Sequence, residues 1–319
     1  MFITTQREDG SSANSAANSR VFQFHLKPLV WPHRRSQRAS ACSIRVKRLA
    51  KSACFIGVLA LSGCLTQQRI DDAILDAWTH DTALPLATRI DETLTIERAY
   101  ALQTRIVRKQ LRGDAPVGFK AGLTSTAAQS RFNAQGPIAG VLLVPASATP
   151  RELPLRSLRG LHLELEVAFR VGKRIDKRLV DVEDLKEHVD GVAPAIELPD
   201  LDYETPKALT ALDIVASNVA AAYFVTGEFL SPAHRDPNQL TATLVCDGKR
   251  ANVGAARDAM GDQWGAALWL ANTMVDQGWT LEPGHVLLTG ALGSAVRARP
   301  GTCVGEFGDW GQLTVHIVP

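Results

Sequence analysis

The sequence predicts an α+β fold in which helices come first and a β-rich body follows. Between residues 67 and 113, apolar residues recur at helical spacing. From residue 114 onward, short runs rich in β-branched and apolar residues are separated by turns that contain proline or glycine. The elements do not form a regular strand–helix alternation, so a doubly wound parallel sheet is not expected. We therefore expect residues 64–319 to form a single α+β domain, with a helical portion at 67–113 and a β-rich body at 114–319.

Helices and strands can be placed along this domain from periodicity and turn signals. Ile70 and Ile74 share one stripe of the first helix, Tyr100 and Val107 share one stripe of the second, and Gly113 is a natural stop for it. The expected helices span residues 67–78, 95–112, 209–225 and 265–277. The expected strands span residues 117–120, 138–144, 163–171, 193–198, 241–246, 285–289 and 313–318.

Composition and charge restrict the class of function. Of the 319 residues, 45% are hydrophobic and 21% are charged, which is typical of a globular protein with a large core. Residues 1–63 contain ten basic and two acidic residues, which leaves 25 basic and 31 acidic residues for the rest of the chain. A mildly acidic body of this kind does not suggest nucleic-acid binding.

The N-terminal part of the chain has the layout of an exported protein. Residues 1–44 are rich in Ser, Ala, Asn and Arg, so we expect a disordered extension or a start codon placed too early. Residues 45–63 combine a basic start with a short apolar run, the pattern of a secretory signal. The run ends in LSGC, which resembles the lipobox of bacterial lipoproteins and implies acylation of Cys64. We expect a lipid-anchored protein of the cell envelope that faces the periplasm. The alternative is an apolar helix that happens to end in cysteine, in a cytoplasmic protein.

Two cysteines, Cys246 and Cys303, remain in the body of the expected mature chain. In an oxidising periplasm they could form a disulfide, but the sequence does not place them within bonding distance. We expect buried free thiols.

The segment GLHLELEVAFRVG, residues 160–172, alternates like a half-buried strand. Its leucine, valine and phenylalanine side chains form one face, and the other face carries His162, Glu164 and Glu166. Two carboxylates two residues apart on a strand can approach one cation. The alternative is that this face is simply exposed to solvent, where glutamate is common.

A third carboxylate and a lysine lie in similarly apolar surroundings. Glu197 occurs in VAPAIELPD, and a carboxylate in such a run is rarely buried unless it is paired or binds a cation. With Glu164 and Glu166 it would form an all-oxygen site that suits Mg²⁺ or Mn²⁺ better than zinc. Lys120 occurs in VGFKAGLTS, where it could act as an acid or as a partner of an oxyanion. The alternatives are a glutamate at a strand end and a lysine whose amine reaches water. No Walker-type loop and no GxSxG motif is present in the sequence.

Six blocks of sequence together carry a family resemblance. In order they are IERAYALQ (96–103), VGFKAGLTS (117–125), ELEVAF (164–169), VAPAIELPD (192–200), ASNVAAAYFVTG (216–227) and LTGALGSAVRARPG (288–301). They resemble the 2-oxopent-4-enoate hydratase/4-oxalocrotonate decarboxylase group of the fumarylacetoacetate hydrolase superfamily. The resemblance covers roughly residues 68–319 and implies a mixed β-roll.

The resemblance also implies a reaction. One Mg²⁺ or Mn²⁺ would be held by the three glutamates, and a small 2-oxo or 2-hydroxydienoic acid would react through a metal-stabilised enolate. Lys120 matches the family lysine that stabilises the enolate or moves its proton. Members often form homo-oligomers. Residues expected to contact the substrate are Leu123, Thr124, Ser125, Asn218 and Ser294.

Two positions depart from the family pattern. Ile138 stands where hydratases usually carry an aspartate, and Gly293 stands where members often have threonine. Because isoleucine cannot orient or activate water, His162 is the remaining candidate for a further proton donor. We expect a hydratase-like carbon–oxygen lyase. The alternatives are a decarboxylase, tautomerase or hydrolase of the same superfamily, and a lipid-anchored binding protein for metal-chelated 2-oxo acids.

Overall fold

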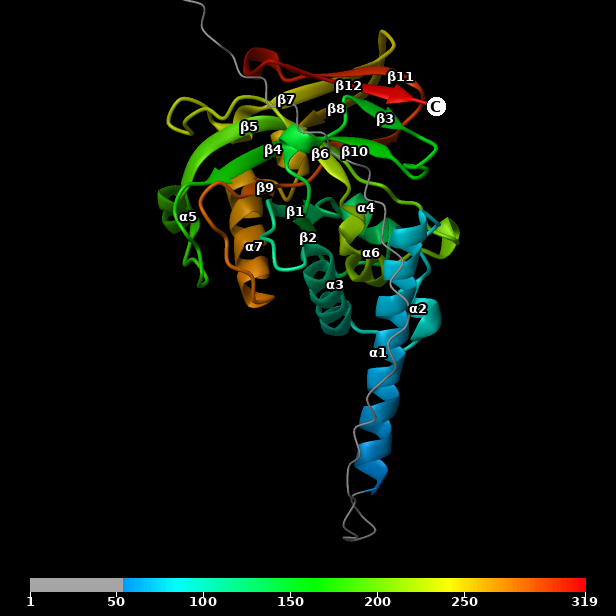
Figure 1. Cartoon of the computed structure of the whole chain (residues 1–319). Helices are drawn as coiled ribbons and strands as arrows, with labels where there is room; N and C mark the ends of the chain where they lie inside the picture. The colour runs from blue at the N-terminus through cyan, green and yellow to red at the C-terminus, as the bar shows by residue number, and fades with distance from the viewer. Residues whose placement is uncertain (1–53) are drawn as a thin grey trace, which may run out of the picture. The chain divides into compact units, whose positions relative to one another are not determined.

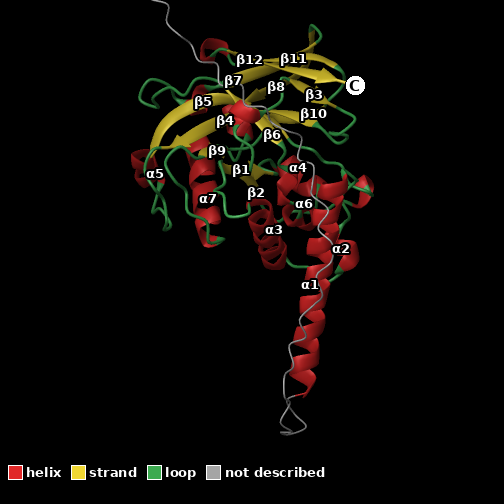
Figure 2. Cartoon of the chain, in the orientation of Figure 1, coloured by secondary structure: helices red, strands yellow, loops and turns green. Residues whose placement is uncertain are grey.

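The computed structural model describes residues 54–319, with side chains from residue 66 onward. The strands of this part form two sheets, which lie above the larger helices in the view of Figures 1 and 2. The described residues belong to one compact unit. The first sheet contains β1 (Gly118–Gly122), β2 (Ile138–Leu142), β4 (His162–Val171), β5 (Val189–Leu198), β6 (Tyr223–Thr226), β9 (Val286–Leu288) and β10 (Leu292–Arg297). The second contains β3 (Glu152–Pro154), β7 (Thr241–Cys246), β8 (Lys249–Ala255), β11 (Gly301–Glu306) and β12 (Gln312–Val318).

The long strand β4 organises the first sheet, whose order is β2-β1-β9-β4-β5-β6. One edge of β4 pairs with β5 along nearly its whole length, antiparallel. The other edge is shared, because β9 pairs with residues 168–170 and β10 pairs with residues 162–165. The second sheet has the order β3-β12-β11-β7-β8. Both sheets contain parallel and antiparallel pairs, which agrees with the expected mixed β-roll.

Helices pack against these sheets through apolar faces. The helices longer than one turn are α1 (Cys54–His80), α2 (Ala87–Ile90), α3 (Ile96–Leu111), α4 (Thr126–Arg131), α5 (Val182–His188), α6 (Ala211–Ala216) and α7 (Gln263–Asp276). The helix α3 begins where the Thr95 hydroxyl accepts a hydrogen bond from Arg98 N, and it ends at Arg112 in a left-handed conformation. Two hydrogen bonds link α3 to α1. Arg105 of α3 donates from Nε and Nη2 to the carboxylate of the buried Asp71 of α1, at 3.0 and 3.1 Å.

The core lies on the apolar face of β4 and β5. A Cβ added to Gly305 of β11 would lie 3.0 Å from both Leu165 and Ile196, so the second sheet packs closely on this face. Farther along β4, the Phe169 ring meets the Trp264 ring of α7 at a centroid distance of 4.9 Å. The apolar face predicted for this strand is therefore confirmed, and the glutamates point away from the main core.

The expected strands and the helices expected at 95–112 and 265–277 are confirmed within a few residues. The helix expected at 67–78 is the last part of the longer α1, and the helix expected at 209–225 is wrong. The structure has α6, a 3₁₀ turn at Asn218–Ala220, and then β6. The helix ends because all three residues of the turn have positive φ angles, which a right-handed helix cannot include. The strands β3, β8, β10 and β11 were not expected, because their short runs contain glycine or charged residues. The strand β6 was not expected because most of its residues fall in the helix predicted at 209–225.

The expected N-terminal features fall largely outside the described residues. The extension at 1–44 and the first part of the signal at 45–63 belong to the undescribed part. From residue 54 the backbone is helical as part of α1, while the side chain of Cys64 is not described. Among residues 54–319, no helix is long and apolar enough to cross a membrane.

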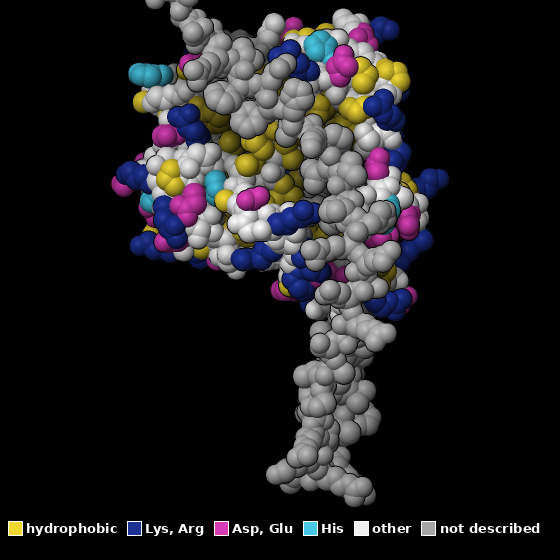
Figure 3. All heavy atoms as spheres, in the orientation of Figure 1, with side chains coloured by type: hydrophobic (Ala, Val, Ile, Leu, Met, Phe, Trp, Pro, Cys, Tyr) yellow, Lys and Arg dark blue, Asp and Glu magenta, His cyan; other side chains and the backbone are white. Residues whose placement is uncertain are grey.

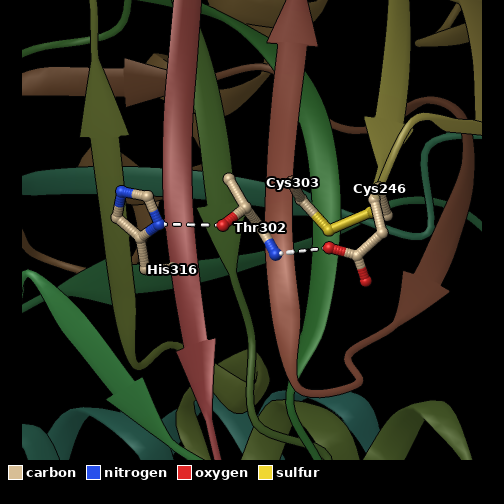
Figure 4. The surroundings of a disulfide bond; sticks show 5 residues. Cys246, Thr302, Cys303 and His316 are labelled. Carbon is tan, nitrogen blue, oxygen red and sulfur yellow. Dashed lines mark hydrogen bonds between the residues drawn. A yellow bond between two sulfur atoms is a disulfide. The ribbon is translucent and has the colours of Figure 1, made fainter.

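The expectation of free thiols is also wrong. Cys246 of β7 and Cys303 of β11 are directly paired in the antiparallel ladder, with Cα atoms 4.0 Å apart, and form a disulfide (Figure 4). Beside it, Thr302 N donates to Asp247 Oδ1 at 2.9 Å, and the Thr302 hydroxyl lies 3.0 Å from His316 Nδ1. The partners are 57 positions apart, so the sequence alone could not reveal that two strands bring them opposite each other.

Replacing both cysteines is expected to lower stability substantially. A loop of this length gives a disulfide contribution of roughly 4 kcal/mol, because the cross-link restricts the unfolded chain. The Cys246→Ala/Cys303→Ala double variant should therefore melt roughly 10 °C below the wild type. Thermal unfolding with and without a phosphine reductant measures this. Reductant should lower the melting temperature of the wild type only, and equal melting temperatures for both proteins would contradict the expectation.

Candidate metal centre

Three glutamates meet on the face of the first sheet that points away from the main core. Glu164 of β4 is the direct partner of Glu197 of β5, and Glu166 lies two residues farther along β4 on the same face. One carboxylate oxygen of each lies within 4.8 Å of the others. Glu166 and Glu197 are fully buried, and Glu164 is half-buried. The alternative that these glutamates lie exposed in solvent therefore does not hold for Glu166 and Glu197.

Burial and mutual repulsion make it costly to ionise all three groups. Burial and the charge of Glu197 raise the pKa of Glu164 to about 7, although Lys120 opposes the shift. Burial, with the charges of its two neighbours, raises the pKa of Glu166 well above its ordinary value. In the metal-free protein, protons therefore offset part of the negative charge that a bound cation would offset.

Lys120 supplies the positive charge nearest to this cluster. Its side chain is 3% exposed, and its ammonium forms an ion pair with Glu197 and donates to the carbonyl of Val219 at 3.1 Å. Burial favours a lower pKa for Lys120, but the negative charges of the three glutamates outweigh it and raise the pKa. Lys120 is therefore a buried, charged group rather than a lysine whose amine lies in water.

The position of Glu166 depends on the gap between β9 and β10. The chain leaves the edge of β4 between these two strands, and Gly290 N donates to Glu166 Oε2 at 2.8 Å. Gly290 has a φ of +106°, and a Cβ there would lie 2.4 Å from the Thr124 hydroxyl. Only glycine fits this close approach. This contact could not be predicted from the sequence, because every residue type other than proline carries the same main-chain donor.

Some carboxylate oxygens of the cluster have no donor among the described residues. Glu166 Oε1 and Glu197 Oε2 are buried and accept no hydrogen bond from this part of the chain. An unsatisfied buried carboxylate oxygen is costly unless a cation binds it. A set of carboxylate oxygens alone suits a hard divalent cation such as Mg²⁺ or Mn²⁺. The residues present therefore fit a metal ion of this class.

The wall beside Lys120 is apolar. Lys120 pairs with Gly140 and Gly122 pairs with Ile138, so all four lie on the same sheet face as the glutamates. Ile138 is 3% exposed. Across the sheet, the same face carries a small apolar cluster of Leu142, Ala168, Ala193, Ala195, Phe224 and Leu288. Figure 3 shows hydrophobic side chains gathered in a hollow in the region of β4 and β9.

His162 lies at the end of the row of polar side chains on β4. It is half-buried, and its Nδ1 lies 2.6 Å from the carbonyl of Gly160. Burial lowers the pKa of His162, and the nearby charges of Arg297 and Arg131 lower it further. A neutral imidazole can accept or donate a proton, but its role in catalysis stays a prediction.

The residues expected to contact substrate do not all present free side chains. The Ser125 hydroxyl caps α4 by accepting from Ala128 N at 3.2 Å. Leu123 has a φ of +52°, and Thr124 is buried next to Gly290. Ser294 is exposed on β10. Their contact with a substrate stays a prediction.

Asn218 uses its side chain to hold β2. Its Oδ1 accepts from Val141 N at 2.8 Å, and its Nδ2 donates to Val141 O at 2.9 Å. Asn218, Val219 and Ala220 have φ angles of 61°, 53° and 54°. This conformation costs roughly 1–2 kcal/mol for each residue other than glycine. One of these strained residues, Val219, provides the carbonyl that accepts the hydrogen bond of Lys120. This backbone strain could not be predicted from the sequence.

Comparison with known proteins identifies the family. Residues 113–318 match the family described as fumarylacetoacetate (FAA) hydrolase C-terminal. The chain belongs to the fumarylacetoacetate hydrolase family. It is 30% identical over 214 residues to a 2-keto-4-pentenoate hydratase of Paraburkholderia xenovorans, which covers 65% of this chain and 78% of the relative. It is 29% identical over 239 residues to a 4-oxalocrotonate decarboxylase of a Pseudomonas species, which covers 74% and 90%.

A solved structure shows the same fold. The 4-oxalocrotonate decarboxylase from Pseudomonas putida G7, complexed with magnesium and adipate, superposes with a TM-score of 0.71 at 24% identity. The superposition covers 79% of this chain and 97% of that one. The expected fold class is therefore confirmed. The relatives of this fumarylacetoacetate hydrolase family member are enzymes, hydratases and decarboxylases among them.

The pH dependence of stability is expected to report on Glu164. Its pKa is about 7 in the native protein and 4.5 ordinarily, so between these values the unfolded chain has lost a proton that the native protein keeps. Rising pH through this window therefore destabilises the metal-free protein through this group. Denaturant unfolding on either side of the window measures the loss.

The matched variant for this measurement is Glu164→Gln, which stays neutral. Its loss of stability over the same window should be smaller than that of the wild type. Excess Mg²⁺ should also reduce the loss in the wild type, because a bound cation favours the ionised carboxylates. An identical pH dependence for wild type and variant, both metal-free, would show that Glu164 does not titrate in this range.

Proposed function

We propose that this protein is a divalent-metal-dependent lyase that acts on a small 2-oxo or 2-hydroxydienoic acid through an enolate. The observation that supports this most is the buried cluster of three carboxylates with Lys120 beside it. Two carboxylate oxygens of the cluster have no donor in the part of the chain that the structure describes. The names of two relatives, 2-keto-4-pentenoate hydratase and 4-oxalocrotonate decarboxylase, point to substrates of this kind.

The proposed metal ligands are Glu164, Glu166 and Glu197, and the proposed ion is Mg²⁺ or Mn²⁺. The related decarboxylase structures are described as complexes with magnesium and with calcium. When bound, such an ion supplies Lewis-acid polarisation of the oxygens of a 2-oxo acid. Gly290 N holds Glu166 in place for this role, and the β4–β5 register holds the other two.

Lys120 is the proposed catalytic residue of the protein itself. Its ammonium is buried, so its positive charge is little screened by water. A developing enolate oxygen close to this ammonium would be stabilised by charge and by a hydrogen bond. The same group can deliver or hold a proton at that oxygen.

The apolar wall favours a reaction that needs no activated water next to Ile138. On the β1–β2 part of this face, the other side chains are glycine, isoleucine and leucine. Hydration at the far end of a dienol would need a base or acid from elsewhere, with His162 as the candidate. Decarboxylation needs only the enolate to be stabilised, so it is the second candidate function that this observation favours. Tautomerase and hydrolase chemistry, or ligand binding alone, are the further alternatives.

The first test follows 2-hydroxypenta-2,4-dienoate by its ultraviolet absorbance, using protein freed of metal and then supplied with Mg²⁺ or Mn²⁺. Product analysis by NMR distinguishes hydration from other outcomes. Metal-dependent formation of the hydrated 2-oxo acid would establish a hydratase. A parallel assay with 4-oxalocrotonate, which loses CO₂, tests the decarboxylase. Tight metal binding without turnover of either compound would favour a binding protein.

Lys120→Ala is expected to lower kcat by about 100-fold with whichever substrate turns over, because the enolate loses its positive partner. Binding of Mg²⁺ should persist, since the three carboxylates remain. Lys186→Ala, which removes an exposed lysine of α5, serves as the control. If Lys120→Ala changes only KM, the lysine binds substrate and does not act in the chemical step.

We also propose that the protein works in the cell envelope, anchored through acylated Cys64. The Cys246–Cys303 disulfide supports this, because structural disulfides persist mainly in oxidising compartments. Ile70, the first fully buried residue among the described side chains of α1, follows Cys64 by only six positions. An anchor at Cys64 would therefore hold the folded unit close to the membrane surface.

Metabolic labelling with an alkyne fatty acid tests this anchor. Wild-type protein should be labelled and should sediment with membranes, whereas Cys64→Ala should be unlabelled. Cys54→Ala, which changes a cysteine in the expected signal, is the matched control and should remain labelled. Unlabelled wild-type protein in the cytoplasm would contradict the proposal and support the alternative location.

A further inference from the structure

The turn between α6 and β6 is strained in a way that a simple connection would not require. Asn218, Val219 and Ala220 all have left-handed φ angles, and none of them is glycine. Such residues persist only where surrounding contacts fix them, and they are concentrated at functional sites. The turn lies next to the buried ammonium of Lys120, whose hydrogen bond goes to the carbonyl of Val219.

Contacts on both sides hold the turn in place. Asn218 holds β2 through two hydrogen bonds to the main chain of Val141. Asp200 N donates to the carbonyl of Ala220 at 2.9 Å, and Ala221 N donates to the carbonyl of Asn218 at 3.1 Å. The carbonyl of Val219 between them is therefore fixed in direction.

The Val219 side chain packs closely against two glycines of the sheet. A Cβ added to Gly122 would lie 2.9 Å from Val219 Cγ1, and one added to Gly140 would lie 2.9 Å from Val219 Cβ. Both glycines lie on the sheet face that carries Lys120, and Gly140 is its direct partner in the ladder. The absence of side chains on both sides of Lys120 therefore lets the turn approach its ammonium.

We infer that the left-handed turn Asn218–Ala220 is a positioning element for Lys120, and that Asn218 is the residue that anchors it. An ammonium has three N–H donors. One faces Glu197 and one is held by the carbonyl of Val219, which leaves one for an oxygen of the substrate. Val219 is the acceptor that does not depend on the metal, because a main-chain carbonyl keeps its place when Glu197 binds a cation. The kinetic part of this inference rests on the proposed function, and the structural part does not.

The protein contains a matched control for Asn218. Asn272 of α7 is likewise buried, and it makes the same pair of hydrogen bonds to one residue, Leu179. Its Oδ1 accepts from Leu179 N at 2.8 Å, and its Nδ2 donates to Leu179 O at 3.0 Å. Alanine at either position removes the same two bonds, but only Asn218 holds the turn beside Lys120.

The first experiment measures solvent exchange of the Lys120 ammonium by ¹⁵N NMR of lysine-labelled, metal-free protein. Its signal is identified by its loss in Lys120→Arg. A buried ammonium with fixed acceptors exchanges slowly, so Asn218→Ala should accelerate exchange by roughly ten-fold or more, whereas Asn272→Ala should leave it near the wild-type rate. Equal exchange in the two variants would overturn the inference. This readout needs no substrate, so it stands even if the proposed reaction is wrong.

The second experiment compares kcat with Mg²⁺ affinity, using the substrate that the wild type turns over. A misplaced Lys120 should lower kcat in Asn218→Ala by roughly ten- to hundred-fold, with the Mg²⁺ dissociation constant little changed. Asn272→Ala should retain kcat even if it is equally destabilised. A purely structural role for Asn218 predicts equal kcat in the two variants once both are folded, and that result would overturn the inference.

Gly140→Ala tests the same inference if Asn218→Ala does not fold. Its new Cβ would lie 2.9 Å from Val219 Cβ and 3.1 Å from the carbonyl oxygen of Asn218, so the turn must move away from β2. Exchange of the Lys120 ammonium should then accelerate and kcat should fall. Wild-type values for both quantities in a folded Gly140→Ala protein would show that the turn does not position Lys120.

Discussion

The register between β4 and β5 places three carboxylates on one buried patch of the sheet, and much of the surrounding structure compensates for their charge. Glu164 and Glu197 are direct partners, and Glu166 is only one ladder step away. In a medium of low polarity, such a cluster is costly unless cations, protons or donors offset it. The Lys120 ammonium and the Gly290 N–H offset part of this negative charge. Protons offset a further part, because the pKa values of Glu164 and Glu166 are raised.

Main-chain groups in irregular backbone hold Glu166 and Lys120 in place. Gly290 lies where the chain passes from β9 to β10, and Val219 lies in the left-handed turn before β6. Regular strands could not supply these contacts, because their N–H and carbonyl groups are used in the ladder. The strain of the turn is therefore confined to the place where a free carbonyl is needed, and the glycines at positions 122 and 140 give it room.

The second sheet supports this site from the opposite face. It packs so closely on the apolar side of β4 and β5 that a Cβ added to Gly305 would lie 3.0 Å from Leu165 and Ile196. The Cys246–Cys303 disulfide joins two of its strands and closes the loop that contains α7, β9 and Gly290. A rigid support of this kind fixes the direction of the metal-facing side chains, because displacement of β4 would disturb both faces at once.

The sequence by itself determined the fold class, seven of the twelve strands of the described part, the helices α3 and α7 and part of α1, and it singled out the three glutamates and Lys120 as site candidates. It could do so because alternation along a strand assigns side chains to faces locally, and because the family blocks carry their residues in order. Only the tertiary structure decided which strands pair and what holds each charged group. Cys246 and Cys303 form a disulfide. The segment 209–225 contains a short helix, a left-handed turn and part of a strand instead of one helix. Main-chain atoms of Gly290 and Val219 bind the charged side chains of the site. These features depend on contacts between residues far apart in the chain and on backbone groups common to every residue, so no local pattern could encode them.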